Sequence, residues 1–249
     1  MRISVITVCF NSAATIDRAL QSVAAQDWPE VEHIVIDGAS RDDTMAVIER
    51  YRQHLAVVVS EPDKGIYDAM NKGLARATGE IVCFLNADDA YVAPDVLSQV
   101  AHEMSTHRLD ALFADVAFFL PEAPERIVRR YRSDRFHPDR LAWGWMPAHP
   151  ALFMRRSIYN QLGGFRTHFR IAGDFDFVAR AFGPGQLRYR HLPKVLVRMQ
   201  AGGVSNAGLR SKWRLNQEVL RSCRENGIRT NIFKILSKYP AKLMELVHP

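Results

Sequence analysis

The sequence predicts an α/β protein built on a mainly parallel, doubly wound, Rossmann-like sheet, with helices at its C-terminal end. Short apolar runs alternate with stretches of helical spacing through roughly the first 90 residues. The fourth apolar run, Ile81–Leu85, is unbroken, which is typical of a strand buried on both faces. Polar residues follow it directly, at Asn86–Asp89, where ligands bind in such sheets.

The elements of this first part follow from their apolar spacing. Runs of β-branched residues predict strands at 3–10, 33–36, 55–59 and 81–85. Three- and four-residue apolar spacing predicts helices at 16–26, from a capping Ser40 to Tyr51, and at 66–79. Right-handed crossovers between parallel strands then place the ends of the first, second and fourth strands at one edge.

The regular alternation is lost in the second part of the chain. The patterns predict a helix at 94–106, a strand at 111–120 and a returning strand at 126–131. Residues 135–150 are rich in aromatic, histidine and proline residues and suit an irregular pocket wall. The remaining expected elements are a helix at 174–182, a strand at 188–197 and two terminal helices.

Composition excludes several classes of protein. The net charge of +6 is divided unevenly, with −7 on residues 1–100 and +13 on residues 101–249. A basic half can face an anionic lipid or substrate, or be an ordinary solvated surface, and no motif of a nucleic-acid-reading module is present. The three cysteines form no CxxC pair, which fits a reducing compartment.

The patterns at the two ends of the sequence lead us to expect a cytoplasmic protein. Met1-Arg2 leads directly into a strand, unlike a signal peptide, and no apolar run approaches the ~20 residues that span a bilayer. Residues 232–247 combine apolar positions with a row of lysines, which predicts either a helix on an anionic membrane surface or a terminal helix packed on the domain. Peripheral association with the inner face of the plasma membrane is therefore a hypothesis.

Polar clusters converge at the predicted edge of the sheet. They are Thr7 to Asn11, Asp37, and Asn86 to Asp89. Adjacent carboxylates repel one another unless a cation lies between them, and hard divalent cations are the usual partners. No G-x-G-x-x-G turn and no P-loop is present, so side chains and a metal would have to hold a diphosphate. The alternative for Asp88-Asp89 is a helix cap or a simple turn.

Several motifs in this order resemble the family 2 glycosyltransferases. They are "SVITVCFN", "IVIDGASRDDT", "SEPDKGIYDAMNKGLARATGEIVCFLNADD", "HPALFMRRSIYNQLGGF" and "AGDFDFVAR". The block "EPDKGIYDAMNKG" resembles the bacterial branch that serves colanic acid, O-antigen and related surface glycans. The resemblance implies a GT-A fold and inverting transfer of a sugar from a nucleotide donor, with UDP-sugars as the expected donors.

The resemblance also implies roles for individual residues. Asp37 matches the aspartate that binds the nucleotide base, and Asp63 matches a second residue near the nucleotide. Asp88 matches the metal ligand of the D-x-D motif, which would hold Mn²⁺ or Mg²⁺. The remaining nucleotide-site positions carried over are Thr7, Cys9, Asn11, Asn86 and Ala87. Asn86 departs from the family because many relatives have aspartate there, and the expected result is either weaker metal binding or a shift of that binding to Asp89.

The catalytic base and the acceptor site fall in the second part of the chain. Asp174 matches the family's base, although Asp176 could be the base on residue type alone, and a helix N-cap is the alternative for Asp174. His149 matches a position near the phosphates or the acceptor, with a simple loop histidine as the alternative. The loop ending at Ser205 is expected to close over the diphosphate.

These expectations define a domain organisation and leave other functions open. Residues 1–205 would form the transferase domain, with a nucleotide half at 1–100 and an acceptor half at 101–205, and residues 206–249 a helical extension. The acceptor would be a hydroxyl of a glycan or a lipid-linked glycan. The alternatives are a sugar-nucleotide nucleotidyltransferase, whose usual glycine-rich loop is absent, and a non-catalytic nucleotide- or glycan-binding protein.

Overall fold

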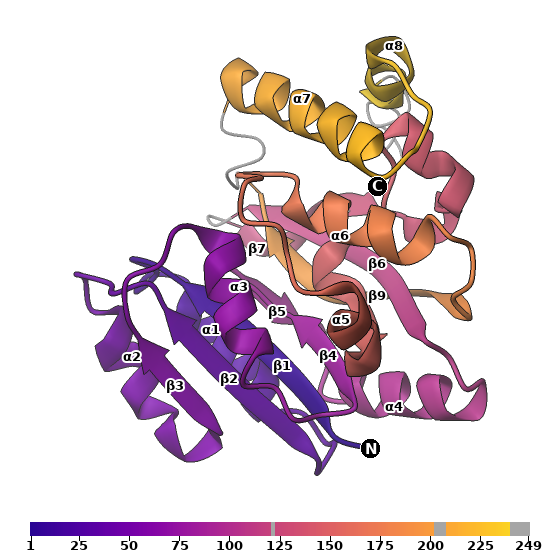
Figure 1. Ribbon diagram of the computed structural model, residues 1–249. Helices are drawn as coiled ribbons and strands as arrows, with labels where there is room; N and C mark the ends of the chain where they lie inside the picture. Colours follow the sequence, from indigo (N-terminus) through magenta and orange to yellow (C-terminus); the bar gives the residue numbers. More distant parts are fainter. Residues whose placement is uncertain (121–122, 202–207, 240–249) are drawn as a thin grey trace.

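The computed structural model describes residues 1–120, 123–201 and 208–239 of the 249-residue chain. Its first part has the predicted order of strands and helices (Figure 1). The elements are β1 (Ile3–Cys9), α1 (Ile16–Ala24), β2 (Val31–Asp37), α2 (Thr44–Arg50), η1 (Arg52–His54), β3 (Val57–Ser60), α3 (Ile66–Leu74) and β4 (Ile81–Phe84). The β-α-β-α-β-α-β prediction is therefore confirmed, with α3 ending five residues earlier than expected.

The second part contains the predicted long strands and several shorter elements. Its strands are β5 (Asp89–Tyr91), β6 (Ala111–Leu120), β7 (Ala123–Tyr131), β8 (Leu152–Arg155) and β9 (Tyr189–Gln200). Its α-helices are α4 (Val96–Thr106), α5 (Arg156–Leu162), α6 (Gly173–Phe182), α7 (Leu209–Glu225) and α8 (Ile232–Leu236). Short 3₁₀ helices occupy the irregular stretch: η2 (Ser133–Arg135), η3 (Pro138–Trp143) and η4 (His149–Ala151).

The strands of the described chain form one mixed sheet of nine strands. Their order is β3-β2-β1-β4-β8-β6-β9-β5, with β7 paired to β6. Strands β1 to β4 are mutually parallel, whereas β8 runs antiparallel between β4 and β6. The parallel direction brings the carboxyl ends of β1, β2 and β4 to one edge, as predicted. This arrangement confirms the α/β, mainly parallel fold class.

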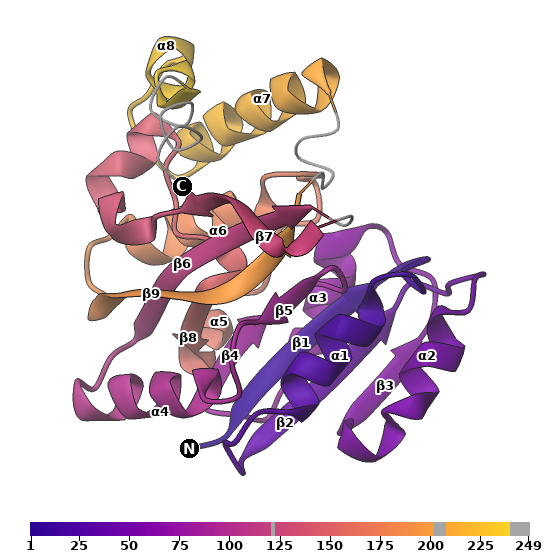
Figure 2. The same ribbon diagram turned by 180° about the vertical axis from the view of Figure 1, so that it is seen from behind.

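Helices cover both faces of the sheet. The face toward the viewer in Figure 1 carries α3, α5 and α6, and the opposite face in Figure 2 carries α1 and α4. Alternate residues of a strand pack against the helices on opposite faces of the sheet, because successive side chains point to opposite faces. Val82 and Phe84 pack under α3 and α6, whereas Cys83 and Leu85 pack with α4. Both faces of β4 are buried, which explains its unbroken apolar sequence.

The terminal helices share the core of the sheet domain. Val219, Leu220 and Cys223 of α7 and Ile235 of α8 are buried in the same cluster as the residues of α6. Within the described residues, no helix is long and apolar enough to cross a membrane. The boundary predicted between a transferase domain and a helical extension stays a prediction.

His33 on β2 is a buried titratable group outside the candidate site. Its Nε2 lies 3.0 Å from the Thr7 hydroxyl, and its Nδ1 has no hydrogen-bond partner in the described chain. Burial lowers the pKa of His33 to about 3. The histidine therefore stays neutral in the folded protein while the unfolded chain takes up a proton below its ordinary pKa of about 6.5.

His33 is expected to make the protein less stable as the pH falls from 7 to 5. Stability is lost as the pH falls through the unfolded pKa, because only the unfolded state gains the proton there. The loss is about 2 kcal/mol at pH 5. Urea unfolding at both pH values should show a smaller loss in His33→Gln. The exposed His54→Gln is the control, and equal slopes in both variants would contradict the assignment.

Candidate active site

Asp37 lies at the carboxyl edge of the sheet, in register with Cys9 of β1 and Ser60 of β3. Its buried carboxylate accepts a hydrogen bond of 2.7 Å from the Ser60 hydroxyl and one of 3.0 Å from the Ser40 backbone N–H. The Ser40 hydroxyl and the Cys9 thiol also donate to it. The carboxylate is thus fixed in orientation by several donors. The prediction that Ser40 caps α2 is wrong, because its hydroxyl is committed to Asp37 and α2 begins at Thr44.

The loops after β1 and β2 are joined by Asn11. Its backbone has a positive φ of 49°, a conformation that asparagine tolerates better than most residues. The Asn11 N–H donates to the Ser40 hydroxyl at 2.8 Å, and its side-chain oxygen accepts from the Arg41 N–H at 2.9 Å. Asn11 therefore connects the loop after β1 to residues 40 and 41 of the loop after β2, next to Asp37.

Asp63 lies against the same edge. One carboxylate oxygen accepts from the Gly65 N–H at 2.7 Å. The other lies where a side chain on Gly38 would begin, so only glycine at position 38 leaves room for it. Asp63 and Asp37 are thus brought together through Gly38, as the sequence analysis expected for the nucleotide edge.

Two of the predicted nucleotide-site residues face the interior. Thr7 has no exposed surface, and its hydroxyl is occupied by His33. Its expected contact with the nucleotide stays a prediction. Cys9 is buried, and burial, with the nearby charge of Asp37, raises the pKa of its thiol. A nucleotide contact of Cys9 stays a prediction.

Asn86 to Asp89 form a tight turn between β4 and β5. The Asn86 amide donates to Asp89 at 3.2 Å, and the Asp89 N–H donates to the Asn86 carbonyl oxygen at 3.1 Å. An aspartate at position 86 would instead set two carboxylates against each other, which gives a physical reason for the asparagine. Ala87 is buried in the cluster formed with α1 and α2.

The two carboxylates of this turn differ in exposure. Asp89 is buried, and burial together with the charge of Asp88 raises its pKa well above the usual range. Asp88 is half-buried, and burial raises its pKa as well. A divalent cation near the turn would relieve this penalty on the charged forms. Asp88 therefore presents the more exposed carboxylate of the turn.

Arg18 of α1 supplies positive charge at the same place. Its guanidinium lies 4.4 Å from the ring centre of Phe119 and donates to the Gln200 side chain at 3.2 Å. The antiparallel ladder of β5 and β9 pairs Asp89 with Met199, the residue before Gln200. Arg18 thereby lowers the pKa of Asp88 against the dominant effect of burial. Sequence analysis missed Arg18 because a single arginine in a helix carries no motif.

The turn also fits a metal ion that is completed by substrate. The side-chain oxygens Oδ1 of Asn86 and Oδ1 of Asp89 are buried and have no hydrogen-bond partner in the described chain. The described residues contain no cluster of three or more metal-binding side chains. A magnesium or manganese ion here would be held through Asp88 and would take its other ligands from phosphate oxygens and water, as such ions often do.

Asp174 lies in the first turn of α6 and is half-buried. Its Oδ1 accepts from the Tyr67 hydroxyl at 3.2 Å and from the Phe175 N–H at 2.8 Å. The described residues donate no hydrogen bond to Oδ2, which leaves that oxygen free to accept a proton. Tyr67 comes from α3, so the two halves of the chain meet at Asp174. The sequence analysis missed this role of Tyr67, although the residue lies in the quoted block "EPDKGIYDAMNKG".

A cavity of about 260 Å³ adjoins Asp174. His149 also lines it, from η4, and its ring stacks on Phe84 with centroids 5.5 Å apart. Burial lowers the pKa of His149, partly offset by the charge of Asp174, so the imidazole is neutral near pH 7. The cavity walls combine apolar and cationic side chains, namely Val116, Phe118, Arg129, Tyr131, Met146, Met199, Lys212, Leu215, Lys238 and Tyr239.

Asp176 has a structural position. It has no exposed surface and pairs with Arg166 at 3.2 Å and Arg180 at 3.0 Å. It also accepts hydrogen bonds from Ser222 of α7 and from Asn226, the residue that follows α7. Asp174 lines the cavity, whereas Asp176 does not. Of the two candidates for the base, the geometry favours Asp174.

The predicted site residues thus form three groups. Asp37, Asn11 and Asp63 share the edge of β1 to β3, Asn86 to Asp89 form the turn after β4, and Asp174 and His149 share the cavity. Phe84 connects the last two groups, because it stacks on His149 and lies two residues before Asn86. Ser205, expected in the closing loop, lies outside the described residues.

Comparisons with known proteins identify the family of the chain. The Glycosyl transferase family 2 profile matches residues 4–170. A PGL/p-HBAD biosynthesis glycosyltransferase of Mycobacterium bovis is 31% identical over 208 residues, which are 82% of this chain and 78% of that protein. The poly(ribitol-phosphate) beta-N-acetylglucosaminyltransferase TarS of Staphylococcus aureus is 36% identical over 117 residues, 45% of this chain and 20% of that enzyme.

Solved structures share the fold. Residues 1–349 of S. aureus TarS in complex with UDP-GlcNAc superpose with a TM-score of 0.68 at 22% identity, covering 89% of this chain and 66% of that one. The mannosyltransferase PcManGT from Pyrobaculum calidifontis, in complex with GDP-Man and Mn²⁺, gives 0.67 at 25% identity, covering 95% and 68%. Together, the profile match, the similar sequences and the shared fold show that the chain belongs to the family 2 glycosyltransferases.

Proposed function

We propose that this glycosyltransferase moves a sugar from a UDP-sugar to a hydroxyl of a cell-surface glycan or glycolipid, with inversion and with Mn²⁺ or Mg²⁺. The observation that carries the proposal is Asp174, which lines a cavity together with His149 and Met199, and Met199 is paired with Asp89 in the sheet. The similar TarS structure holds UDP-GlcNAc, and PcManGT holds GDP-Man with Mn²⁺. These complexes support a nucleotide-sugar donor and a metal for this chain.

Asp174 would act as the base. Its Oδ1 is held by Tyr67 and the Phe175 N–H, so Oδ2 is oriented to take the proton of the acceptor hydroxyl. The acceptor oxygen then attacks the anomeric carbon from the side opposite the diphosphate, which inverts the configuration. One carboxylate suffices for this reaction, in agreement with the structural position of Asp176.

The leaving diphosphate would be stabilised at the turn after β4. A bound Mn²⁺ or Mg²⁺ supplies a Lewis acid that neutralises the developing charge. Asp88 would hold that ion, and Arg18 adds a fixed positive charge near the same position. Asp37 and Asp63 would orient the nucleoside at the edge of β1 to β3. Neutral His149 would contact the acceptor from the wall of the cavity.

The test of this proposal is turnover with defined donors. Purified protein is incubated with UDP-GlcNAc, UDP-glucose, UDP-galactose and GDP-mannose, with Mn²⁺ or EDTA, and released nucleotide is measured with and without glycolipid extracts. Metal-dependent release from a UDP-sugar that increases with acceptor is expected. Binding of UDP without any release would point to the non-catalytic alternative. Formation of UDP-sugar from UTP and sugar phosphate would point to a nucleotidyltransferase.

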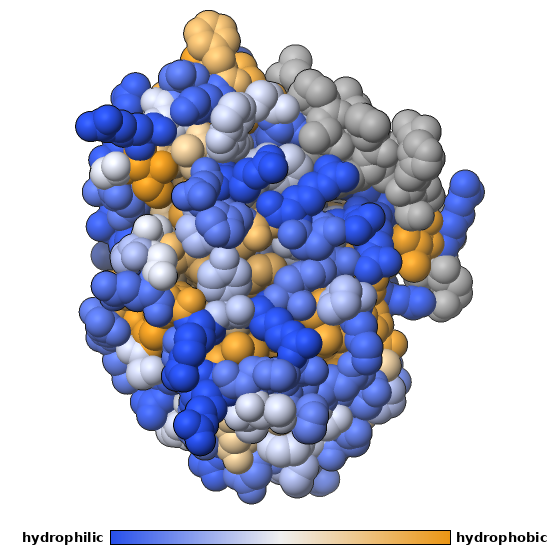
Figure 3. Space-filling model, turned by 90° about the vertical axis from the view of Figure 1, so that its right-hand side faces the viewer, coloured by the Kyte–Doolittle hydropathy of each residue, from blue (hydrophilic) through white to orange (hydrophobic). Residues whose placement is uncertain are grey.

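We further propose peripheral association with an anionic membrane. An apolar patch at the end that carries α8 consists of Trp143, Phe233 and Leu236, whose side chains are 40%, 81% and 37% exposed. Lys234 lies 5.5 Å from the Trp143 ring centre, and apolar side chains project at the top of Figure 3. Aromatic rings flanked by lysine suit a headgroup region. Ile235 and Lys238 are buried instead, so α8 also packs on the domain, and the predicted helix beyond residue 239 lies outside the described residues.

Phe233→Ser is expected to weaken binding to anionic vesicles about tenfold, because the exposed ring would lose its burial in the bilayer. Co-sedimentation with phosphatidylglycerol vesicles measures the effect. Trp213→Ser is the control, because this tryptophan is 60% exposed on α7 rather than in the patch. Equal loss in both variants, or no binding by the unmodified protein, would remove the patch as the membrane contact.

A further inference from the structure

Glu218 of α7 binds the backbone of the segment that leads into α6. Its carboxylate accepts from the N–H groups of Arg170 at 3.1 Å, Ile171 at 2.8 Å and Ala172 at 2.9 Å. Three consecutive backbone donors converge on one charged acceptor, and hydrogen bonds to a charged group are stronger than neutral ones. Glu218 also lies beyond residues 4–170, the part matched by the family profile.

The same segment is held from the opposite side by Tyr67. The Tyr67 hydroxyl donates to the Ile171 carbonyl oxygen at 2.6 Å and lies 3.2 Å from Asp174 Oδ1. Ile171 is therefore bound at its N–H by α7 and at its carbonyl by α3. Only Gly173 separates Ala172 from Asp174, so the backbone at 170–172 sets the direction of the Asp174 side chain.

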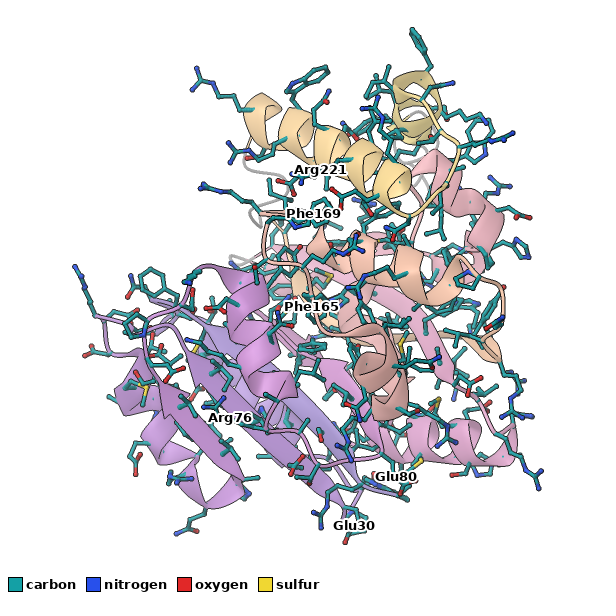
Figure 4. All side chains as sticks on the ribbon, viewed as in Figure 1. Glu30, Arg76, Glu80, Phe165, Phe169 and Arg221 are labelled. Atoms are coloured by element: carbon teal, nitrogen blue, oxygen red, sulfur yellow. The ribbon has the colours of Figure 1, made fainter. Side chains whose placement is uncertain are left out.

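The position of α7 does not depend on Glu218. Ser222 and Asn226 donate to buried Asp176 of α6, and Arg221 lies over the Phe169 ring at 5.6 Å (Figure 4). Apolar side chains of α7 are buried in the main core as well. Loss of the Glu218 charge would thus release residues 170–172 while α7 stays in place.

We infer that Glu218 is a positioning residue, which holds residues 170–172 so that Asp174 faces the cavity and the acceptor hydroxyl. The inference rests on the proposed function, because it assigns a task in the same transfer reaction. It also makes α7 a part of the catalytic unit. Glu218 does not line the cavity beside Asp174, so its effect is expected on turnover and not on donor binding.

The substitution Glu218→Gln tests this positioning role, because it removes the charge and leaves the shape of the side chain nearly unchanged. The amide presents N–H groups to backbone donors, and the segment loses its charged acceptor. We expect kcat to fall about 30-fold, because small displacements of a catalytic group have effects of this size. The donor KM and the affinity for UDP should stay within twofold. Glu225→Gln is the matched control, because Glu225 lies on the same helix and, among the described residues, pairs with the side chains of Arg166, His168 and Arg221. It should retain kcat within twofold.

Hydrogen–deuterium exchange gives a second measurement that needs no turnover. The amides of residues 170–172 should exchange at least tenfold faster in Glu218→Gln and at the unmodified rate in Glu225→Gln. Unchanged kcat in Glu218→Gln, or an equal fall in both variants, would overturn the positioning role. If the unmodified protein shows no transfer, the proposed function fails. Faster exchange in Glu218→Gln alone would then support the link between α7 and the segment, and unchanged exchange would overturn it too.

Discussion

Asp174→Asn is expected to lower kcat for sugar transfer about 10³-fold while the donor still binds. An amide at position 174 cannot take the proton of the acceptor hydroxyl, and a positioned base contributes about 10²–10⁴-fold to such reactions. The Tyr67 hydroxyl can still donate to the amide oxygen, so the local fold should persist. Steady-state kinetics with UDP titration by calorimetry separates the two effects. Transfer at an unchanged rate would remove Asp174 as the base.

Asp176→Asn is the control, because it is expected to lower stability and to leave turnover nearly unchanged. Asp176 has no exposed surface, and its loss of charge leaves Arg166 and Arg180 without their buried partner. We expect the free energy of unfolding to fall by about 3 kcal/mol. The fraction that stays folded should keep near-normal turnover. A folded but inactive Asp176→Asn protein would reverse the assignment of the two aspartates.

Asp88→Asn is expected to lower kcat/KM at least 100-fold and to abolish the response to Mn²⁺. The half-exposed Asp88 carboxylate is the charged group that the turn offers to a cation bound by diphosphate. UDP binding in Mn²⁺ should fall to the level seen in EDTA, whereas binding of uridine should be unchanged. A variant that retains metal-dependent binding of UDP would place the ion elsewhere.

Asp89→Asn separates the metal ligand from its neighbour. Asp89 is buried, accepts from the Asn86 amide, and has its pKa raised by burial and by the charge of Asp88. An uncharged side chain of the same shape is therefore tolerated at position 89. We expect UDP affinity in Mn²⁺ to stay within about threefold, since the charge lost there faces the interior. A loss as large as that of Asp88→Asn would indicate that both carboxylates share the ion.

The sheet was predictable from sequence because its strands are local patterns. The run Ile81–Phe84 is apolar at every position, and such a run has few places in a fold other than the middle of a sheet. Strand β5 escaped prediction because Asp89–Tyr91 is only three residues long and owes its conformation to pairing with β9. Ser40 was misassigned because a serine before a helix reads as a cap, whereas the buried charge of Asp37 competes for the same hydroxyl.

The residue types of the candidate site could be predicted from the sequence. The residues that hold those side chains in place were harder to predict. Asp37, Asp88 and Asp174 could be recognised because each lies in a segment that resembles the family 2 glycosyltransferases. Tyr67, Arg18 and Glu218 act through contacts that span 46 to 182 residues of sequence, from Glu218 to Ala172 and from Arg18 to Gln200. No periodic pattern in the sequence predicts contacts between residues so far apart.

The antiparallel insertion of β8 between β4 and β6 has a consequence for how the chain acquires its fold. Until residues 152–155 are in place, β4 presents an unpaired edge of backbone N–H and carbonyl groups beside β1. An emerging N-terminal half therefore exposes an apolar edge strand, which is a template for pairing between chains. Folding must wait for contacts between residues about 70 positions apart, so we expect it to be slow, and truncation before β8 should give aggregation in place of a soluble nucleotide-binding half.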